Sequence, residues 1–235
     1  MLHTPVEIER PGVFSEAVAA DNLRYYFDFM NQTLITRGTP IDFLFFGDSI
    51  TQGWELNAYF SPRWLTVNRG IGGDRTKYAR ARFKADVLDL KPRHCIMMIG
   101  INDAWDLEPD LWHHIPGLEL EDVLDEAYSN LEAMANMARD AGQSLIICSV
   151  LPTNMAFTFA EEARKTYVVR LNQKLKTLCE KRGIPYVDYF SAFVKEDGRT
   201  ANDDYFFEGL HPHVMGYDLM AQILEETLPQ YGIEI

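Results

Sequence analysis

A serine and a distant histidine are the side chains best suited to chemistry in this chain. Ser49 ends the motif Gly47-Asp48-Ser49, which directly follows the apolar residues 43–46, and His211 lies far downstream. An apolar run that stops at Gly-Asp-Ser predicts a buried strand with a serine at its carboxyl end, where open α/β sheets bind their ligands. A histidine can serve as general base for a serine nucleophile. These residues therefore predict a serine hydrolase.

Two further loops offer groups that could stabilise a developing negative charge. The glycine-rich segment 70–73 follows a predicted strand at 64–68, and glycines let backbone N–H groups approach an oxyanion closely. Asn102 follows a predicted strand at 94–99, and its side-chain amide donates without changing protonation state. Taken singly, the first is also typical of an ordinary strand-to-helix loop or a phosphate-binding turn, and the second of a helix cap. Their joint occurrence beside strand ends favours catalysis.

With Ser49, Gly73, Asn102 and His211 in this order, the chain resembles the SGNH hydrolase superfamily of GDSL esterases and lipases, from about residue 41 to the last helix. The segment from Gly70 to Asp74 is similar to the platelet-activating-factor acetylhydrolase-like branch. The resemblance implies that Ser49 is the nucleophile and that His211 is general base and then general acid. It also implies an oxyanion hole made of the Gly73 N–H, the Asn102 side chain and the Ser49 N–H, with no metal or organic cofactor.

The sequence departs from the family pattern at the acid that orients the histidine. The family usually places an aspartate three residues before the histidine, and here that position is Glu208. A glutamate can still hold one imidazole nitrogen, as it does in other hydrolase triads. Asp203 or Asp204 could serve instead, or a backbone carbonyl could assist a Ser–His dyad. Glu208 is the preferred orienting acid.

The order of predicted elements is typical of a parallel α/β domain. Apolar runs predict strands at 41–46, 64–68, 94–99, 144–150 and from 186, and periodic segments predict helices at 15–36, 75–90, 118–141, 161–182 and 212–228. Val18, Tyr25 and Phe29 are expected on the apolar face of the first helix. The alternation predicts a three-layer α/β/α sandwich with a five-stranded parallel, flavodoxin-like sheet. One domain is expected over 1–235, with 1–40 packed on it as an N-terminal helical segment.

Charge and cysteine content exclude several classes of protein. The 235 residues carry a formal net charge of −13, which opposes binding to nucleic acid or to an anionic membrane. Cys95, Cys148 and Cys179 are an odd and widely spaced set, which favours buried thiols over a disulfide framework or a metal site. Residues 1–11 show no signal-peptide pattern, and no apolar run is long enough to cross a bilayer. A cytoplasmic protein is expected.

The loops at the strand ends are expected to determine the substrate. Asp48, Trp54, Trp105 and Asn154 lie in or beside those loops and are candidates for lining the substrate site. The sequence favours a short acyl group, such as an acetyl ester of a carbohydrate or other small molecule. A lysophospholipase or thioesterase-type acyl hydrolase is the alternative enzyme, and a two-fold homodimer is the expected oligomer.

Two readings from other classes stay open at this point. Glu208, His211 and His213 could form a metal site, although a His-x-His spacing interrupted by proline suits a strand better than a helix start. Alternatively, the fold could be kept as a catalytically silent carbohydrate-binding domain. Hydrolysis of a simple ester that depends on Ser49 separates the enzyme from the binding domain.

Overall fold

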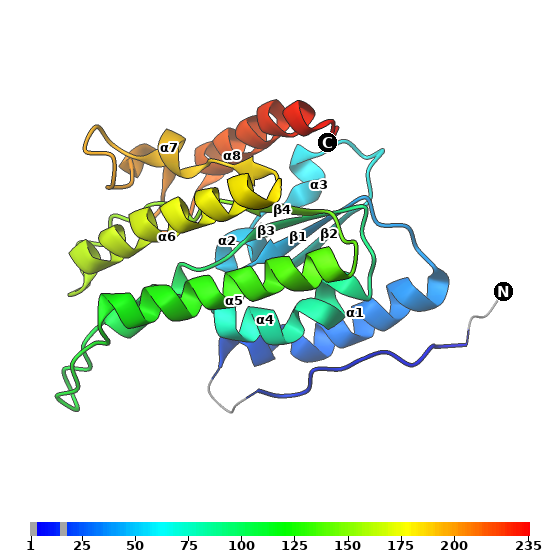
Figure 1. Ribbon diagram of the computed structural model, residues 1–235, viewed down its shortest axis with the longest axis horizontal. Helices are drawn as coiled ribbons and strands as arrows, with labels where there is room; N and C mark the ends of the chain where they lie inside the picture. The colour runs from blue at the N-terminus through cyan, green and yellow to red at the C-terminus, as the bar shows by residue number, and fades with distance from the viewer. Residues whose placement is uncertain (1–3, 15–17) are drawn as a thin grey trace. The chain divides into compact units, whose positions relative to one another are not determined.

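The computed structural model describes residues 4–14 and 18–235 and contains a five-stranded sheet (Figure 1). The strands are β1 (Phe43–Gly47), β2 (Thr66–Gly70), β3 (His94–Met98), β4 (Leu145–Cys148) and β5 (Tyr186–Val187). They lie in the order β2-β1-β3-β4-β5, with β1 parallel to β2 and β3, and β4 parallel to β5. The parallel α/β fold expected from the sequence is confirmed, with most strands shorter than predicted.

Helices precede β1, occupy the connections between the strands and follow β5 (Figure 1). They are α1 (Arg24–Arg37), α2 (Ser49–Gln52), α3 (Leu56–Tyr59), α4 (Thr76–Phe83), α5 (Leu120–Asp140), α6 (Glu161–Arg182), α7 (Phe190–Phe193) and α8 (Val214–Thr227). The predicted helix at 161–182 is confirmed to the residue, because Gly183 ends it in the left-handed conformation (φ +65°) that glycine adopts without strain. The predicted helix at 75–90 is α4 followed by a π-helical turn, Lys84–Leu88. Among the described residues, no helix is both long and apolar enough to cross a membrane.

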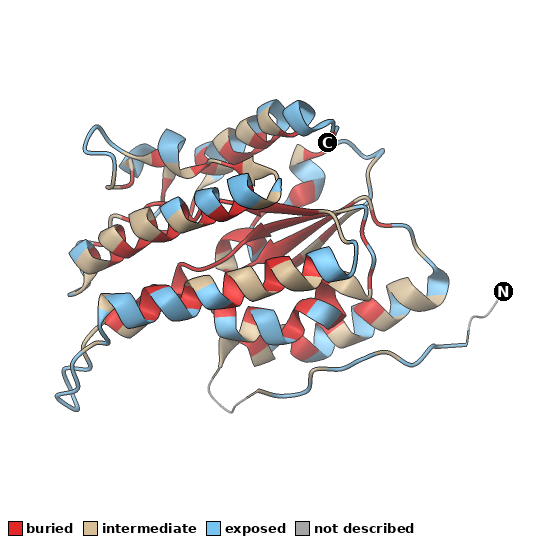
Figure 2. Cartoon of the chain, in the orientation of Figure 1, coloured by how far each residue is buried: buried red, intermediate tan, exposed pale blue. Residues whose placement is uncertain are grey.

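The chain divides into two compact units. The first comprises the described residues of Met1–Ile99 together with Asn130–Leu145, and it contains β1, β2 and β3. In it, the two faces of β1 carry different partners, because successive side chains of a strand point to opposite sides. Phe45 packs against Trp54 and Phe60, whereas Phe46 packs edge-on against Phe83 of α4. Helical segments therefore cover both faces of β1, which is buried along its length (Figure 2).

The second unit comprises Gly100–Ser129 and Ile146–Ile235. Here α6 is tied to neighbouring loops by side-chain hydrogen bonds. Asn172 accepts from the Val150 N–H and donates to the Val150 carbonyl, both at 2.8 Å, and the Tyr167 hydroxyl donates to the Gly100 carbonyl at 2.8 Å. Burial raises the pKa of Tyr167 well above its ordinary value, so the hydroxyl stays a donor. These bonds fix the backbone that follows β4 and the backbone that follows Ile99.

The cysteines are free and buried, as the sequence predicted. Burial raises the pKa of the Cys179 thiol to about 12 and that of Cys148 further, so both stay protonated near neutral pH. A protonated, buried thiol is a small apolar side chain and a poor nucleophile. Neither thiol is therefore suited to act as a nucleophile.

The apolar face predicted for the first helix is wrong. Tyr25 and Phe29 are 79% and 64% exposed, and the buried side chains of α1 are Arg24, Phe27 and Asn31. Part of the predicted helix, residues 15–17, lies outside the described residues, and the chain begins a 3₁₀ turn at Ala19–Leu23 before α1. Polar residues occupy the inner face because their partners in a buried charge network come from a distant helix.

Candidate active site

Ser49 stands at the start of a short helix that follows the carboxyl end of β1. The Asp48 carboxylate caps this helix by accepting from the Ile50 N–H at 3.0 Å, and the Asp48 carbonyl accepts from the Gln52 N–H at 2.8 Å. Gly47 allows β1 to approach β3 closely, because a side chain there would collide with the Met98 carbonyl of β3. The half-buried Ser49 is thus held at the edge of the sheet where α/β proteins bind ligands.

The glycine-rich segment after β2 forms a turn beside Ser49. The Asp74 N–H donates to the Ile71 carbonyl at 3.0 Å, and Gly73 has φ +76°, a value that favours glycine. A Cβ placed on Gly72 would lie 3.7 Å from the Cβ of Ser49. The structure therefore brings two of the predicted site segments together within the first unit, at the strand ends of β1 and β2.

Arg82 of α4 is the buried cation that holds both segments. Its Nε donates to Asp74 Oδ2 at 2.8 Å, its Nη2 donates to the Gly47 carbonyl at 3.0 Å, and its Nη1 donates to the Arg69 carbonyl at 3.0 Å. The guanidinium also stacks over the Phe46 ring at 4.2 Å. One side chain thereby fixes the backbone just before Ser49, the end of β2 and the end of the glycine turn.

The charge on Arg82 is balanced by a second carboxylate, Asp86. Arg82 Nη1 donates to Asp86 Oδ2 at 3.1 Å, Arg24 binds both oxygens of Asp86 at 2.6 and 2.5 Å, and Asn31 adds a bond at 2.7 Å. Burial alone would raise the pKa of Asp86, but the hydrogen bond from Arg24 and the charge of Arg82 lower it below its ordinary value. Burial does raise the pKa of Asp74, against the effect of Arg82. The result is a satisfied ionic cluster inside the first unit.

Asn102 lies in the second unit, at the start of a 3₁₀ helix, Asn102–Leu107, that follows β3. Gly100 takes φ +135° in the turn that leads to it, and Tyr167 holds the Gly100 carbonyl. Asn102 is buried. β3 pairs in register with β1 so that Met98 lies opposite Gly47. The carboxyl ends of β1 and β3 therefore lie side by side within the first unit.

His211 is paired with Glu208, also in the second unit. Glu208 Oε1 contacts His211 Nδ1, and the two side chains are 41% and 39% exposed. An ionised carboxylate can only accept, so this contact favours the tautomer of a neutral imidazole that has its proton on Nδ1 and its basic nitrogen at Nε2. The loop between them turns through Gly209 (φ +82°), whose carbonyl accepts from the Asn154 N–H at 2.8 Å. This is the arrangement that orients a general base.

The alternative acid Asp203 is committed to other partners. Asn154 Nδ2 donates to Asp203 Oδ1 at 2.5 Å, and Lys195 Nζ donates to Asp203 Oδ2 at 2.6 Å. The hydrogen bonds from Lys195 and Asn154 lower the pKa of Asp203, which is ionised and engaged on both oxygens. Of the carboxylates considered from the sequence, Glu208 is the one found on the His211 Nδ1.

His213 has a structural position. Its Nδ1 accepts from the Met215 N–H at 3.2 Å and so caps the start of α8, while its ring packs edge-on against Phe207 at 5.6 Å. Within residues 4–14 and 18–235, no group of three histidine, cysteine, aspartate or glutamate side chains is placed to hold a metal ion. The residues considered for a metal site are thus used for helix capping and for the His211–Glu208 pair.

The residues predicted to line a substrate occupy different surroundings. Asp48 is buried as a helix cap, and Trp54 is buried in the aromatic cluster around Phe45. Trp105 is partly exposed and lies under the Arg164 guanidinium at 4.7 Å. Asn154 bridges two loops of the second unit through Asp203 and Gly209, as described above. None of these positions tests a contact with substrate, so the lining role stays a prediction.

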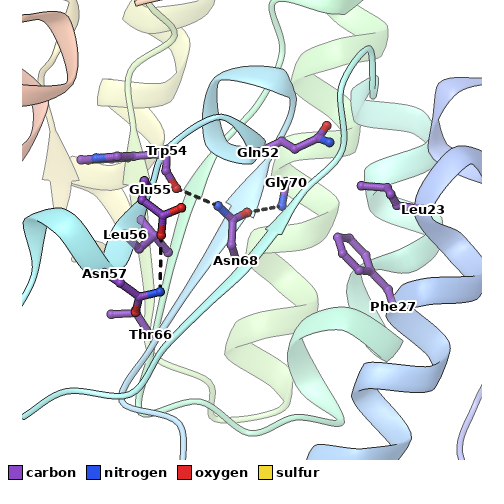
Figure 3. A pocket seen from close by; sticks show the side chains of 10 residues that line it. All are labelled: Leu23, Phe27, Gln52, Trp54, Glu55, Leu56, Asn57, Thr66, Asn68 and Gly70. Atoms are coloured by element: carbon purple, nitrogen blue, oxygen red, sulfur yellow. Dashed lines mark hydrogen bonds between the residues drawn. The ribbon is translucent and has the colours of Figure 1, made fainter. Parts of the chain in front are cut away.

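A cavity of about 300 Å³ opens beside the edge strand β2 in the first unit (Figure 3). Ten residues line it: Leu23, Phe27, Gln52, Trp54, Glu55, Leu56, Asn57, Thr66, Asn68 and Gly70. Asn68 links two other lining residues, since its side chain donates to the Trp54 carbonyl at 3.2 Å and accepts from the Gly70 N–H at 2.8 Å. Gln52, another lining residue, is one helical turn beyond Ser49.

Sequence reasoning missed Gln52 and Arg82. Gln52 Oε1 accepts from the Gly72 N–H at 2.5 Å and so links α2 to the glycine turn. A usable signal existed for Arg82, because it lies among apolar positions of a predicted amphipathic helix. No comparable signal marked Gln52, because one polar residue at a helix end is ordinary.

Comparisons with known proteins identify a family model and related sequences. The sequence model of the GDSL-like lipase/acylhydrolase family matches residues 45–219, which include Ser49, Gly73, Asn102, Glu208 and His211. The chain is 27% identical to the uncharacterized lipoprotein YqeF of Bacillus subtilis over 194 residues, covering 69% of this chain and 76% of that protein. It is 25% identical to an acetylxylan esterase of Geobacillus stearothermophilus over 157 residues, covering 66% and 68%.

A solved structure shows the same fold. The crystal structure of a GDSL-like lipase from Bacteroides thetaiotaomicron superposes with a TM-score of 0.73 and 23% identity, covering 90% of this chain and 99% of that one. At this identity the likeness concerns the fold.

Proposed function

The chain belongs to the GDSL-like lipase/acylhydrolase family and is a carboxylic ester hydrolase, and from this premise we propose that it cleaves short acyl esters through an acyl-enzyme on Ser49. Acetyl esters of a carbohydrate are the proposed substrate class. The observation that carries the proposal is the position of Ser49 at the carboxyl end of β1, beside the Gly72–Gly73 turn. A nucleophile next to a glycine turn that can offer a backbone N–H is the arrangement that acyl transfer requires.

In the proposed reaction, His211 Nε2 takes the proton of Ser49 while the hydroxyl oxygen attacks the ester carbonyl carbon. The carbonyl π electrons move onto oxygen, and the Gly73 N–H, the Asn102 side-chain amide and the Ser49 N–H donate to that oxyanion. The C–O bond to the alcohol then breaks, and the alcohol leaves with the proton from His211. Water, deprotonated by His211, attacks the acyl-enzyme and releases the acid and free Ser49. Glu208 holds the imidazole in the tautomer that this cycle needs.

Exposed aromatic rings near His211 support a carbohydrate substrate. Phe157 and Phe159 are exposed on the loop that holds Asn154, and Phe207 is 76% exposed next to Glu208. The Asn154–Gly209 hydrogen bond joins these two loops within the second unit. Flat, exposed aromatic rings provide apolar faces on which a sugar ring can stack. The acetylxylan esterase among the relatives supports the same substrate class.

The test compares wild type with Ser49→Ala and His211→Ala on p-nitrophenyl acetate. Each substitution should lower kcat by roughly 10⁴-fold or more while the circular dichroism spectrum is unchanged. Ser191→Ala is the matched control, because Ser191 is a surface serine bonded to Asp188 at 2.7 Å, and it should retain full activity. An inert wild type would favour the silent binding domain, and loss of activity on chelation would favour the metal site.

Substrate class is tested with acetylated xylooligosaccharides against fatty acyl esters of rising chain length. We expect kcat/KM to be highest for acetyl esters and to fall as the acyl chain lengthens. If kcat/KM is instead highest for long-chain acyl esters, lysophospholipid or acyl thioesters, the alternative acyl hydrolase is supported.

The reaction rate should fall on acidification, because a protonated His211 cannot accept the serine proton. The measurement is kcat/KM for p-nitrophenyl acetate between pH 8 and pH 4. A rate that stays constant down to pH 4 would contradict the role given to His211.

A cytoplasmic location, a two-fold homodimer and a single domain over the whole chain stay predictions. Membrane fractionation of expressing cells tests the first, and it has a particular interest because one relative is called a lipoprotein. Light scattering of the purified protein tests the second, and a single cooperative unfolding transition would support the third.

A further inference from the structure

The Gly72–Gly73 peptide is the part of the first unit whose orientation matters most to the proposed oxyanion hole. Ile71 to Asp74 form a β-turn with Gly73 at φ +76°, close to the value of about +80° at the third residue of a type II turn. Type I and type II turns differ by a flip of this central peptide, which reverses the direction of its N–H. Two glycines impose no side-chain penalty on either form. The sequence of the turn alone therefore does not fix the Gly73 N–H.

The two ends of the turn are anchored from the protein interior. The Ile71 N–H donates to the Gly47 carbonyl at 3.0 Å, and Arg82 holds the Asp74 carboxylate at 2.8 Å. These contacts set where the turn begins and ends. They do not reach its middle, where the flip occurs.

Gln52 binds the turn directly next to its central peptide. Its Oε1 accepts from the Gly72 N–H at 2.5 Å, on the peptide directly before the Gly72–Gly73 peptide. The backbone of Gln52 is itself fixed, because its N–H donates to the Asp48 carbonyl and because β2 approaches so closely that a side chain on Gly70 would collide with it. Gln52 is one turn beyond Ser49 on α2, so a single rigid helix carries both the nucleophile and this contact.

We propose that Gln52 is a positioning residue that locks the glycine turn in the form that presents the Gly73 N–H to the oxyanion. This inference rests on the proposed esterase function and adds a residue to its machinery. Gln52 acts through Gly73 and does not touch the reacting atoms. Because the oxyanion forms only in the transition state, loss of the lock lowers kcat and leaves ground-state binding unchanged.

The experiment replaces Gln52 with leucine, which keeps a similar size and removes the accepting oxygen. Gln52 is exposed, so Gln52→Leu should fold with a Tm within about 2 °C of wild type. We expect kcat on p-nitrophenyl acetate to fall roughly 10-fold, with KM changed less than about 2-fold. The rate of covalent inactivation by an uncharged phosphonate ester should fall in parallel, because phosphonylation of the serine also develops charge on an oxygen.

Gln222→Leu is the matched control. Gln222 is an exposed glutamine on α8 that donates to Glu226 at 2.8 Å, so the control removes one surface glutamine hydrogen bond away from the turn. It should leave kcat, KM and the inactivation rate unchanged.

Three outcomes would overturn the inference. They are an unchanged kcat in Gln52→Leu, a loss of kcat/KM in Gln52→Leu that comes entirely from a higher KM, and an equal loss of kcat in Gln222→Leu. Failure of the proposed function has a different signature, since wild type itself would then neither hydrolyse the ester nor react with the phosphonate. An active wild type with a fully active Gln52→Leu would refute the role of Gln52 and leave the esterase proposal intact.

Discussion

The nucleophile side and the histidine side of the proposed triad are held by different kinds of structure. In the first unit, Ser49 and its glycine turn rest on Arg82 and Asp74, both fully buried. In the second unit, His211 and Glu208 form a pair that is about 40% exposed, on a surface loop. The difference follows from what each group does. A nucleophile and its N–H donors act by position, whereas a base must exchange its proton with substrate and water.

Burying charge on the nucleophile side has an energetic consequence. Removing ions from water is unfavourable, and ion pairs in the interior recover this only when every donor and acceptor is matched. Here Arg82 donates to two carboxylates and two backbone carbonyls, and Arg24 and Asn31 donate further hydrogen bonds to Asp86. Such a cluster adds little net stability compared with an apolar core, but it fixes one geometry. On the exposed side, solvent screens the Glu208–His211 pair, which therefore contributes orientation more than stability.

The largest effect expected from this comparison is on stability, in Arg82→Met. The substitution leaves Asp74 and Asp86 buried without their shared cation, and it should lower the free energy of unfolding by about 3–5 kcal/mol. Urea denaturation followed by circular dichroism measures it. Arg139→Met is the control, because Arg139 is exposed and paired only with its exposed neighbour Asp140 in the contacts described, and it should change little. A loss below about 1 kcal/mol in Arg82→Met would show that the cluster does not hold the nucleophile side.

The next effect is on activity, in Glu208→Gln. A neutral amide cannot hold the proton on His211 Nδ1 as a carboxylate does, so kcat should fall about 100-fold with no change in Tm beyond about 2 °C. Steady-state kinetics and thermal denaturation measure the two quantities. Asp203→Asn tests the alternative acid and should lower kcat by less than about 3-fold. The reverse ranking of the two variants would assign the orienting role to Asp203.

The smallest effect is a pH dependence of stability in the second unit. Burial alone would raise the pKa of Glu108, but hydrogen bonds from Arg164 and from the Ala160 and Phe159 N–H groups lower it below its ordinary value of 4.5. An acid whose pKa is lower in the folded state stabilises the fold above its unfolded-state pKa, and this stabilisation is lost as the pH falls through the folded-state value.

Glu108→Gln should therefore be less stable than wild type by about 1 kcal/mol at pH 7, and the difference should shrink below about pH 4. Urea midpoints at pH 7, 5 and 3 provide the measurement. Glu225→Gln changes an exposed position of α8, and its urea midpoint should equal that of wild type at each pH. A difference between Glu108→Gln and wild type that grows on acidification would contradict the sign of the shift.

Local sequence determined most of the elements. The helix at Glu161–Arg182 was predicted with its observed bounds, because Gly183 supplies a left-handed end that few other residues tolerate. The run before Ser49 was predicted as a buried strand because it consists of continuous apolar residues that stop at Gly-Asp-Ser. The Gly-Asp-Ser motif likewise placed Ser49 at a strand end, since a glycine and a helix-capping aspartate act within a few residues of each other.

Tertiary structure decided which polar residues are buried and which partners they meet. Tyr25 and Phe29 were predicted to face inward, yet they are exposed and Arg24 is buried, because Asp86, 62 positions beyond Arg24, lies against that face of α1. Contacts within the second unit also separate the two candidate acids, since Asn154 and Lys195 bind Asp203 whereas Glu208 contacts His211, and the orienting role of Glu208 stays a prediction. Hydrophobic periodicity reports the average environment of a helix face. It carries no information on a specific ionic partner brought close only when the chain folds.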